Sequence, residues 1–104
     1  MHKISLILLG TLLGTMLYAD NYRGCSDGGC TEFHGTVNRH GLVLRSPRTT
    51  LYIGKSCDAY SKVYGKGRWE WANGGFVVQF PHKRFGFARQ VPQMGIDISH
   101  CLMQ

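Results

Sequence analysis

The side chains best suited to acid–base chemistry are one glutamate and four histidines beyond the N-terminal segment, at His34, His40, His82 and His100. A ribonuclease would need a carboxylate base, an imidazole acid and a cation to stabilise the developing charge. Glu70 with one of His34, His82 or His100, supported by Arg68 or Arg84, offers those residue types. Alternatively, Glu70 pairs with these arginines on an exposed sheet face, where such pairs contribute little to stability. We favour this second interpretation and predict no catalytic residue.

Other motifs of catalysis and metal binding are missing from the sequence. It contains neither H-E-x-x-H nor G-x-S-x-G, the patterns of zinc and serine hydrolases. Gly65-Lys66-Gly67 lacks the flanking residues of a phosphate-binding loop and is interpreted as a turn. The cysteines do not form the two close pairs that an all-cysteine zinc site requires. We therefore predict no metal ligand and no cofactor.

The first nineteen residues have the pattern of a cleaved secretory signal. His2 and Lys3 precede an apolar run over residues 4–17, and Ala19 supplies a small residue before polar Asp20. The run is too short to span a bilayer comfortably. We predict a signal peptide over residues 1–19 and a single domain over residues 20–104, with an uncleaved anchor as the alternative.

An even number of cysteines behind an export signal predicts two disulfides and a periplasmic or secreted protein. The four residues are Cys25, Cys30, Cys57 and Cys101. Residues 26–29 read as a tight turn that would set Cys25 opposite Cys30, which favours Cys25–Cys30 with Cys57–Cys101. Cys25–Cys101 with Cys30–Cys57 remains open.

Alternating hydrophobicity and frequent turn residues predict an all-β fold. Strands are expected over residues 31–36, 42–44 and 49–55, followed by three consecutive strands between Gly65 and Gln90. Asn38 and Gly41 predict a chain reversal over residues 37–41. In that last region Trp69 and Trp71 share one face, and Asn73-Gly74-Gly75 forms a hairpin turn. Short helical turns are expected over residues 59–64. We predict a small antiparallel meander, closed like a barrel or stacked as a sandwich.

A basic charge favours an anionic partner. The chain has 12 Lys and Arg against 6 Asp and Glu, and loss of Lys3 with the signal leaves eleven against six. Aromatic and basic residues alternate in one segment, which is typical of interfaces. The predicted binding residues are Tyr60, Lys62, Tyr64, Lys66 and Arg68, with Tyr52 and Lys55 nearby. The alternative is that the tyrosines complete the rim of the core.

The segment from Tyr64 to Phe80 resembles the C-type lysozyme inhibitors of the bacterial periplasm. Tyr64, Trp71, Gly74 and the strand Val77 to Phe80 match the tyrosine, the Trp-x-x-Gly motif and the apolar strand of that family. The resemblance implies a small exported β-barrel with disulfide bonding. The family's serine and lysine correspond here to Tyr60 and Asn73, so the inhibitory residues do not carry over.

These observations lead to three functional hypotheses. We favour an exported binding module, inhibitor-like or envelope-associated, whose partner is a protein or an anionic envelope component, nucleic acid being a less natural partner after export. The first alternative is a secreted ribonuclease that uses Glu70 and a histidine. The second is a periplasmic protein similar to the lysozyme inhibitors. The sequence does not determine the oligomeric state.

Overall fold

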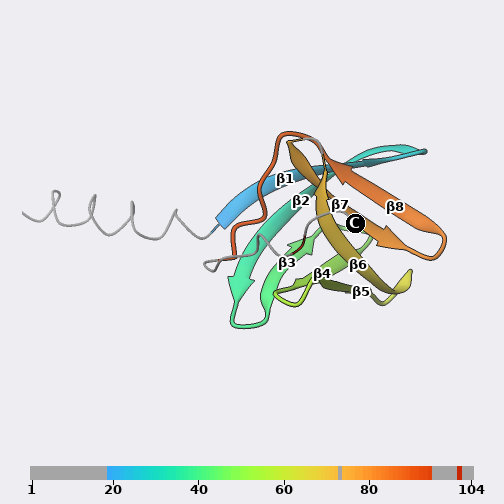
Figure 1. Ribbon diagram of the computed structural model, residues 1–104. Helices are drawn as coiled ribbons and strands as arrows, with labels where there is room; N and C mark the ends of the chain where they lie inside the picture. The colour runs from blue at the N-terminus through green and yellow to red at the C-terminus, as the bar shows by residue number, and fades with distance from the viewer. Residues whose placement is uncertain (1–18, 73, 95–100, 102–104) are drawn as a thin grey trace, which may run out of the picture.

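The chain forms a closed antiparallel barrel of eight strands in the computed structural model, which describes residues 19–72, 74–94 and 101 (Figure 1). Each strand pairs with its neighbours in sequence, and β8 returns to pair with β1. The strands are β1 (Ala19–Ser26), β2 (Gly29–Asn38), β3 (Gly41–Arg45), β4 (Thr50–Gly54), β5 (Asp58–Ser61), β6 (Gly65–Ala72), β7 (Gly75–Phe80) and β8 (Lys83–Phe87). The predicted all-β class is confirmed, and the meander closes into a barrel.

Two local predictions need correction. Helical turns were expected over residues 59–64, but residues 59–61 belong to β5 (Asp58–Ser61), in which Ala59 and Ser61 point inward and Tyr60 points outward, and residues 62–64 form the turn of the β5–β6 hairpin. The strand Ala19–Ser26 was not predicted, because over residues 21–26 Tyr22 is the one buried side chain, so the strand shows no clear alternation of apolar and polar residues. The predicted signal segment lies outside the described residues except for Ala19, as does Asn73 of the predicted hairpin.

The turn between β2 and β3 shows how side chains set the strand register. The Asn38 Oδ1 atom accepts hydrogen bonds from the backbone N–H groups of His40 (2.8 Å) and Gly41 (3.0 Å). Gly41 has φ of 151°, and a Cβ there would overlap the carbonyl oxygen of Ile53. The reversal predicted from Asn38 and Gly41 therefore has a specific cause: an amide cap followed by a residue that must lack a side chain.

Aromatic side chains fill the barrel interior, as expected for eight strands, whose interior is just wide enough for side chains. Phe76 and Phe87 stack with ring centroids 4.4 Å apart, and the Trp69 ring meets Phe76 edge to face at 6.1 Å. The Trp69 indole N–H donates to the carbonyl of Gly54 at 2.8 Å, so its polar atom is satisfied inside the core. Trp71 is partly buried and packs on Trp69, which confirms that the two indoles share a face.

One register pair joins β8 to β1 where the barrel closes. Cys25 is the register partner of Gly86, and Gly24 leaves room for Phe87, whose Cζ would lie 2.6 Å from a Cβ at that position. Beyond this pair the side chain of Gln90, and not a backbone strand, hydrogen-bonds to the backbone of β1. Its Oε1 accepts from the N–H of Arg23 at 2.7 Å, and its Nε2 donates to the carbonyl of the same residue at 2.8 Å.

Both predicted disulfides are present, and the described chain has no free cysteine. Cys25 and Cys30 face each other across the β1–β2 hairpin, as the turn at residues 26–29 predicted. Cys57–Cys101 ties the C-terminal part of the chain to the β4–β5 connection. Such bonds are typical of an oxidising, extracellular or periplasmic environment.

The Cys57–Cys101 bridge also completes the sheet beside β6. Strand β5 is shorter than β6, so the second half of β6 extends beyond it. There the carbonyl of Cys57 accepts from Trp69 N–H at 3.0 Å, and the carbonyl of Cys101 accepts from Trp71 N–H at 2.8 Å. Cys101 and Met94, both buried, join the core at this end of the barrel. Figure 1 shows the segment after β8 running down past the start of β1.

We predict that Gln90→Glu lowers the free energy of unfolding by about 1 kcal/mol, because the carboxylate cannot donate to the Arg23 carbonyl. Urea unfolding followed by circular dichroism measures the effect. Gln93→Glu is the control, since the neighbouring Gln93 contacts Tyr22 through its backbone N–H. Equal stability of the two variants would contradict the role assigned to Gln90.

The two disulfides should contribute unequally. Cys57–Cys101 spans 44 positions and Cys25–Cys30 spans 5. In the chain-entropy model these loops correspond to about 4 and about 2 kcal/mol. We expect Cys57→Ser with Cys101→Ser to destabilise the protein more than Cys25→Ser with Cys30→Ser in denaturant unfolding. The opposite order would show that loop entropy does not govern their contributions.

Candidate functional site

The five residues predicted to bind a partner lie on the β5–β6 hairpin but divide between two surfaces. Tyr60, Lys66 and Arg68 point outward from the barrel wall, and Lys62 is exposed in the connecting turn. Tyr64 instead turns toward the barrel end, where it packs on Phe80 and Phe85. The structure therefore does not gather all five into one patch.

The outward-facing residues form a surface that we call the tyrosine face, defined by Tyr52, Tyr60, Lys66 and Arg68. Tyr52 on β4 is the register partner of Tyr60 on β5, and Tyr60 is the partner of Lys66 on β6. The two tyrosine rings lie 6.2 Å apart and remain 45% and 46% exposed. Two large rings thus stand side by side at the surface, next to a basic residue.

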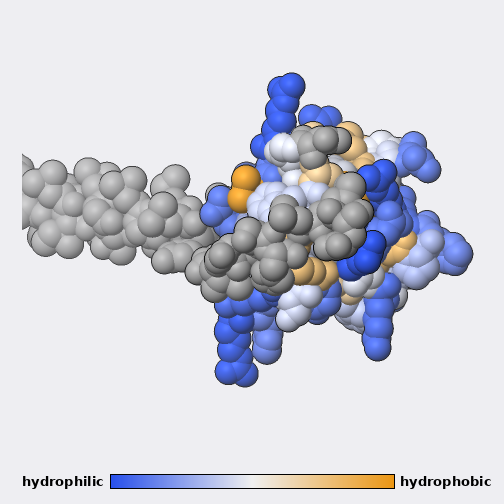
Figure 2. Space-filling model, viewed as in Figure 1, coloured by the Kyte–Doolittle hydropathy of each residue, from blue (hydrophilic) through white to orange (hydrophobic). Residues whose placement is uncertain are grey.

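The charges around the tyrosine face are mostly positive. Arg68, Gln79 and Arg84 follow one another across β6, β7 and β8, with Asp58 on the other side of Arg68. No carboxylate of the described residues lies within ion-pair distance of Lys66, Arg68 or Arg84. The ion pair found in the described chain lies elsewhere, between Arg23 on β1 and Glu32 on β2, at 3.6 Å. In Figure 2, long hydrophilic side chains project around the domain.

A shallow hollow of about 100 Å³ adjoins the two tyrosines. Val43, buried between neighbouring strands, lies opposite Tyr52, and His40 and Asp58 line the rim. A hollow beside exposed aromatic rings can accommodate a side chain of a binding partner.

A second, larger feature is the open end of the barrel, which we call the mouth cavity. In an up-and-down barrel every second hairpin turn lies at the same end, so the β1–β2, β3–β4, β5–β6 and β7–β8 turns meet there. They enclose a cavity of about 580 Å³. Its wall includes Thr31, Arg48, Tyr64, Lys83 and Phe85.

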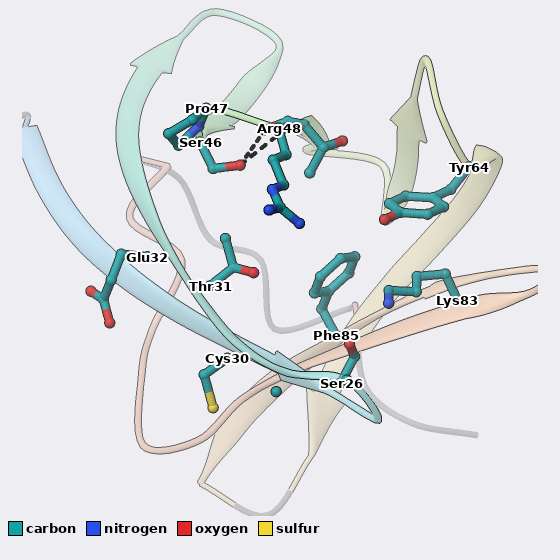
Figure 3. A pocket seen from close by; sticks show the side chains of 13 residues that line it. Ser26, Cys30, Thr31, Glu32, Ser46, Pro47, Arg48, Tyr64, Lys83 and Phe85 are labelled. Atoms are coloured by element: carbon teal, nitrogen blue, oxygen red, sulfur yellow. Dashed lines mark hydrogen bonds between the residues drawn. The ribbon is translucent and has the colours of Figure 1, made fainter.

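Figure 3 shows how these side chains lie. Arg48 extends from the β3–β4 connection toward the Phe85 ring, and Tyr64 directs its hydroxyl group toward the same space. The Lys83 ammonium lies 5.5 Å from the Phe85 ring centroid and 5.8 Å from that of Tyr64. Arg48 and Lys83 were not predicted from the sequence, because a cation in a turn has no distinguishing pattern until the turns are known to meet.

Ser61 holds the two sides of the mouth cavity together. It is fully buried, and its Oγ accepts hydrogen bonds from the N–H groups of Val63 (3.1 Å) and Tyr64 (3.3 Å). The same Oγ lies 3.4 Å from Thr49 Oγ1 on the β3–β4 connection. The turn that presents Tyr64 is therefore fastened to the connection that presents Arg48.

The structure does not bring together Glu70 and the histidines that were considered as an acid–base pair from the sequence. Glu70 and His34 lie on β6 and β2, four strands apart around a ring of eight, and both point outward. Glu70 pairs with Val77, which lies three residues, or about 10 Å, before the end of β7 at Phe80, and His82 lies in the turn beyond that end. Among the described residues Glu70 makes no ion pair with Arg68 or Arg84. His100 lies outside the described residues.

The described residues provide neither a metal-binding cluster nor a membrane-spanning helix. No group of three or more His, Cys, Asp or Glu side chains in residues 19–72, 74–94 and 101 is placed to hold a metal ion. The same residues contain no helix with the length and apolar character needed to cross a bilayer.

Comparison with known proteins adds no assignment: no family model, curated protein or solved structure matches the chain. Of the residues that carry the resemblance to the lysozyme inhibitors, Tyr64 precedes β6 and Trp71 lies near the far end of that strand, so the two pack against opposite ends of the core.

We predict that Ser61→Ala lowers the free energy of unfolding by about 1–3 kcal/mol, because two backbone N–H groups lose their acceptor. Hydrogen exchange at Val63 and Tyr64 should accelerate relative to the core strands, as measured by NMR. Ser56→Ala, at an exposed position, is the control and should leave both quantities unchanged. Unchanged exchange in Ser61→Ala would show that the turn does not depend on the hydroxyl.

Proposed function

We propose that this protein is an exported binding module that recognises an acidic protein through its tyrosine face. The observation that supports this most directly is the exposed Tyr52–Tyr60 pair beside Lys66 and Arg68, whose charges have no carboxylate partner among the described residues. Tyrosine and arginine are enriched in interface hot spots, because they combine large contact area with directional hydrogen bonding.

Export to the periplasm or the cell exterior forms part of this proposal. The two disulfides support an oxidising compartment, and the sequence of residues 1–19 has the pattern of a signal peptide. A rigid, disulfide-bonded barrel also suits recognition, because a surface that is already ordered loses little conformational entropy on binding.

A protein partner is favoured over a lipid surface by the shape of the tyrosine face. A basic patch that binds anionic lipids needs only charge. Here two aromatic rings and a hollow of about 100 Å³ lie beside the charges. A protein whose side chains fit the hollow and pack on the rings would bind more tightly than a surface that offers charge alone. Lys62, at the adjoining turn, adds a further cation at the edge of the surface.

The test is capture of a partner from an envelope extract of the native host with the oxidised protein. We expect Lys66→Glu with Arg68→Glu to reduce binding of the captured partner by about tenfold or more, and Tyr60→Ala to have a similar effect. Arg23→Glu with Arg89→Glu makes the same change in net charge away from the tyrosine face and should bind like the wild type.

If both charge-reversal variants lost the same affinity for the partner, net charge alone would explain the binding, and the proposed site would be contradicted. Binding to vesicles of anionic lipid alone, with the same dependence on Lys66 and Arg68, would replace the protein partner with a membrane surface. Concentration-dependent self-association on sizing would instead favour a structural role.

The two alternative functions predict different activities. A ribonuclease would cleave single-stranded RNA, and Glu70→Gln would abolish that cleavage. A lysozyme-inhibitor-like protein would reduce the activity of a C-type lysozyme; the closed barrel agrees with that resemblance, whereas the basic charge opposes binding to a basic enzyme. Either activity at stoichiometric or catalytic levels would displace the proposal.

A further inference from the structure

The mouth cavity is a separate feature from the tyrosine face and requires its own explanation. Its volume of about 580 Å³ lies within the range of small-molecule sites. It is open at the end of the barrel that carries the β1–β2, β3–β4, β5–β6 and β7–β8 turns, whereas Met94 and Cys101 join the core at the other end.

Hydrogen-bond donors surround this cavity. The Arg48 guanidinium, the Lys83 ammonium and the hydroxyl groups of Tyr64 and Thr31 lie around the space above the Phe85 ring (Figure 3). Within the described part of the chain, neither Arg48 nor Lys83 has a carboxylate partner. Two cations without counter-ions beside a cavity attract an anion, and a guanidinium can bind a carboxylate or phosphate through two hydrogen bonds.

The acidic residue that lines this cavity is already paired. Glu32 lies at the rim, where its Oε2 is 3.6 Å from the Arg23 Nε, and both side chains are largely exposed. In Figure 3 the Glu32 carboxylate is directed away from Arg48 and Lys83. The positive charge of those two residues is therefore not cancelled by this carboxylate.

The remainder of the wall is apolar or fixed in place. Pro47 lies at the rim and Phe85 at the floor, with the partly buried Tyr64 ring beside it. Ser46 Oγ donates to the carbonyl of Thr49 at 2.8 Å, which orders the short connection that carries Arg48. Together with the Ser61 contacts described above, this bond preorganises both walls of the cavity before a ligand enters.

We propose that the mouth cavity binds a small organic oxyanion, a carboxylate or a phosphate monoester. Its charged group lies between Arg48 and Lys83, and its apolar body contacts Tyr64, Phe85 and Pro47. This inference is independent of the proposed function, because Arg48 and Lys83 do not belong to the tyrosine face.

The experiment is an NMR titration of the oxidised, isotope-labelled protein with benzoate, phenyl phosphate and benzamide. Benzoate or phenyl phosphate should shift the amide signals of residues 30–32, 48–49 and 83–85, and the anion that binds more strongly identifies the preferred charged group. Benzamide has the size and ring of benzoate but no charge, and it should bind at least about tenfold more weakly.

Two variants assign the binding to the proposed residues. Arg48→Gln and Lys83→Met should each weaken binding of the anion by about tenfold or more, because each removes a charge-assisted hydrogen bond. Lys83→Met keeps an apolar stem over the rings, and the positions of core amide signals confirm that each variant is folded. Arg39→Gln, in the β2–β3 turn away from the cavity, should bind like the wild type.

Several results would overturn the proposal. One is the absence of amide shifts at concentrations of either anion up to tens of millimolar. Another is an affinity for benzamide equal to that for benzoate. A third is an equal loss of anion affinity in Arg39→Gln and Arg48→Gln. The variant Lys66→Glu with Arg68→Glu should retain anion binding. Its loss there would also contradict a separate site, so the outcomes for the mouth cavity and the tyrosine face remain distinguishable.

Discussion

Closure of the sheet between β8 and β1 is the constraint on which the rest of the structure depends. An open eight-stranded sheet would expose its aromatic face and two strand edges, and a barrel removes both problems at once. The closure relies on small and unusual contacts: Gly24 admits the Phe87 ring, and the Gln90 amide acts as a strand partner for Arg23. The aromatic core and both candidate surfaces exist only because this seam holds.

Closure also determines which residues reach the solvent. Trp69 points inward and donates to the Gly54 carbonyl, so its neighbour Arg68 points outward, because successive side chains of a strand alternate between its two faces. Pairing between β4, β5 and β6 then aligns Tyr52, Tyr60 and Lys66 on the outer surface. The tyrosine face is therefore the external counterpart of the packed core. The mouth cavity depends on a different property, the meeting of alternate turns at one end of the ring.

The sequence predicted features that depend on local chemistry. The strands between Gly65 and Phe87, the Asn38 reversal and the Cys25–Cys30 hairpin follow from alternation, turn residues and short spacing. Features that depend on the closed ring were not predictable in the same way. Over residues 21–26 of β1, Tyr22 is the one buried side chain. Ser61 gains its role only when the β3–β4 connection meets it, and Arg48 and Lys83 are 35 positions apart in the chain. Tyr64 and Lys66 face different surfaces, because residues close together in a hairpin can point in different directions.

The Cys101 carbonyl that accepts from Trp71 has a consequence for how the chain reaches its final form. The Cys57–Cys101 bond holds this carbonyl beside the second half of β6, which extends beyond β5. An uncovered strand edge is a template for pairing with another chain. Because disulfides form where thiols are oxidised, the same step that closes the bond also secures a backbone partner at this edge.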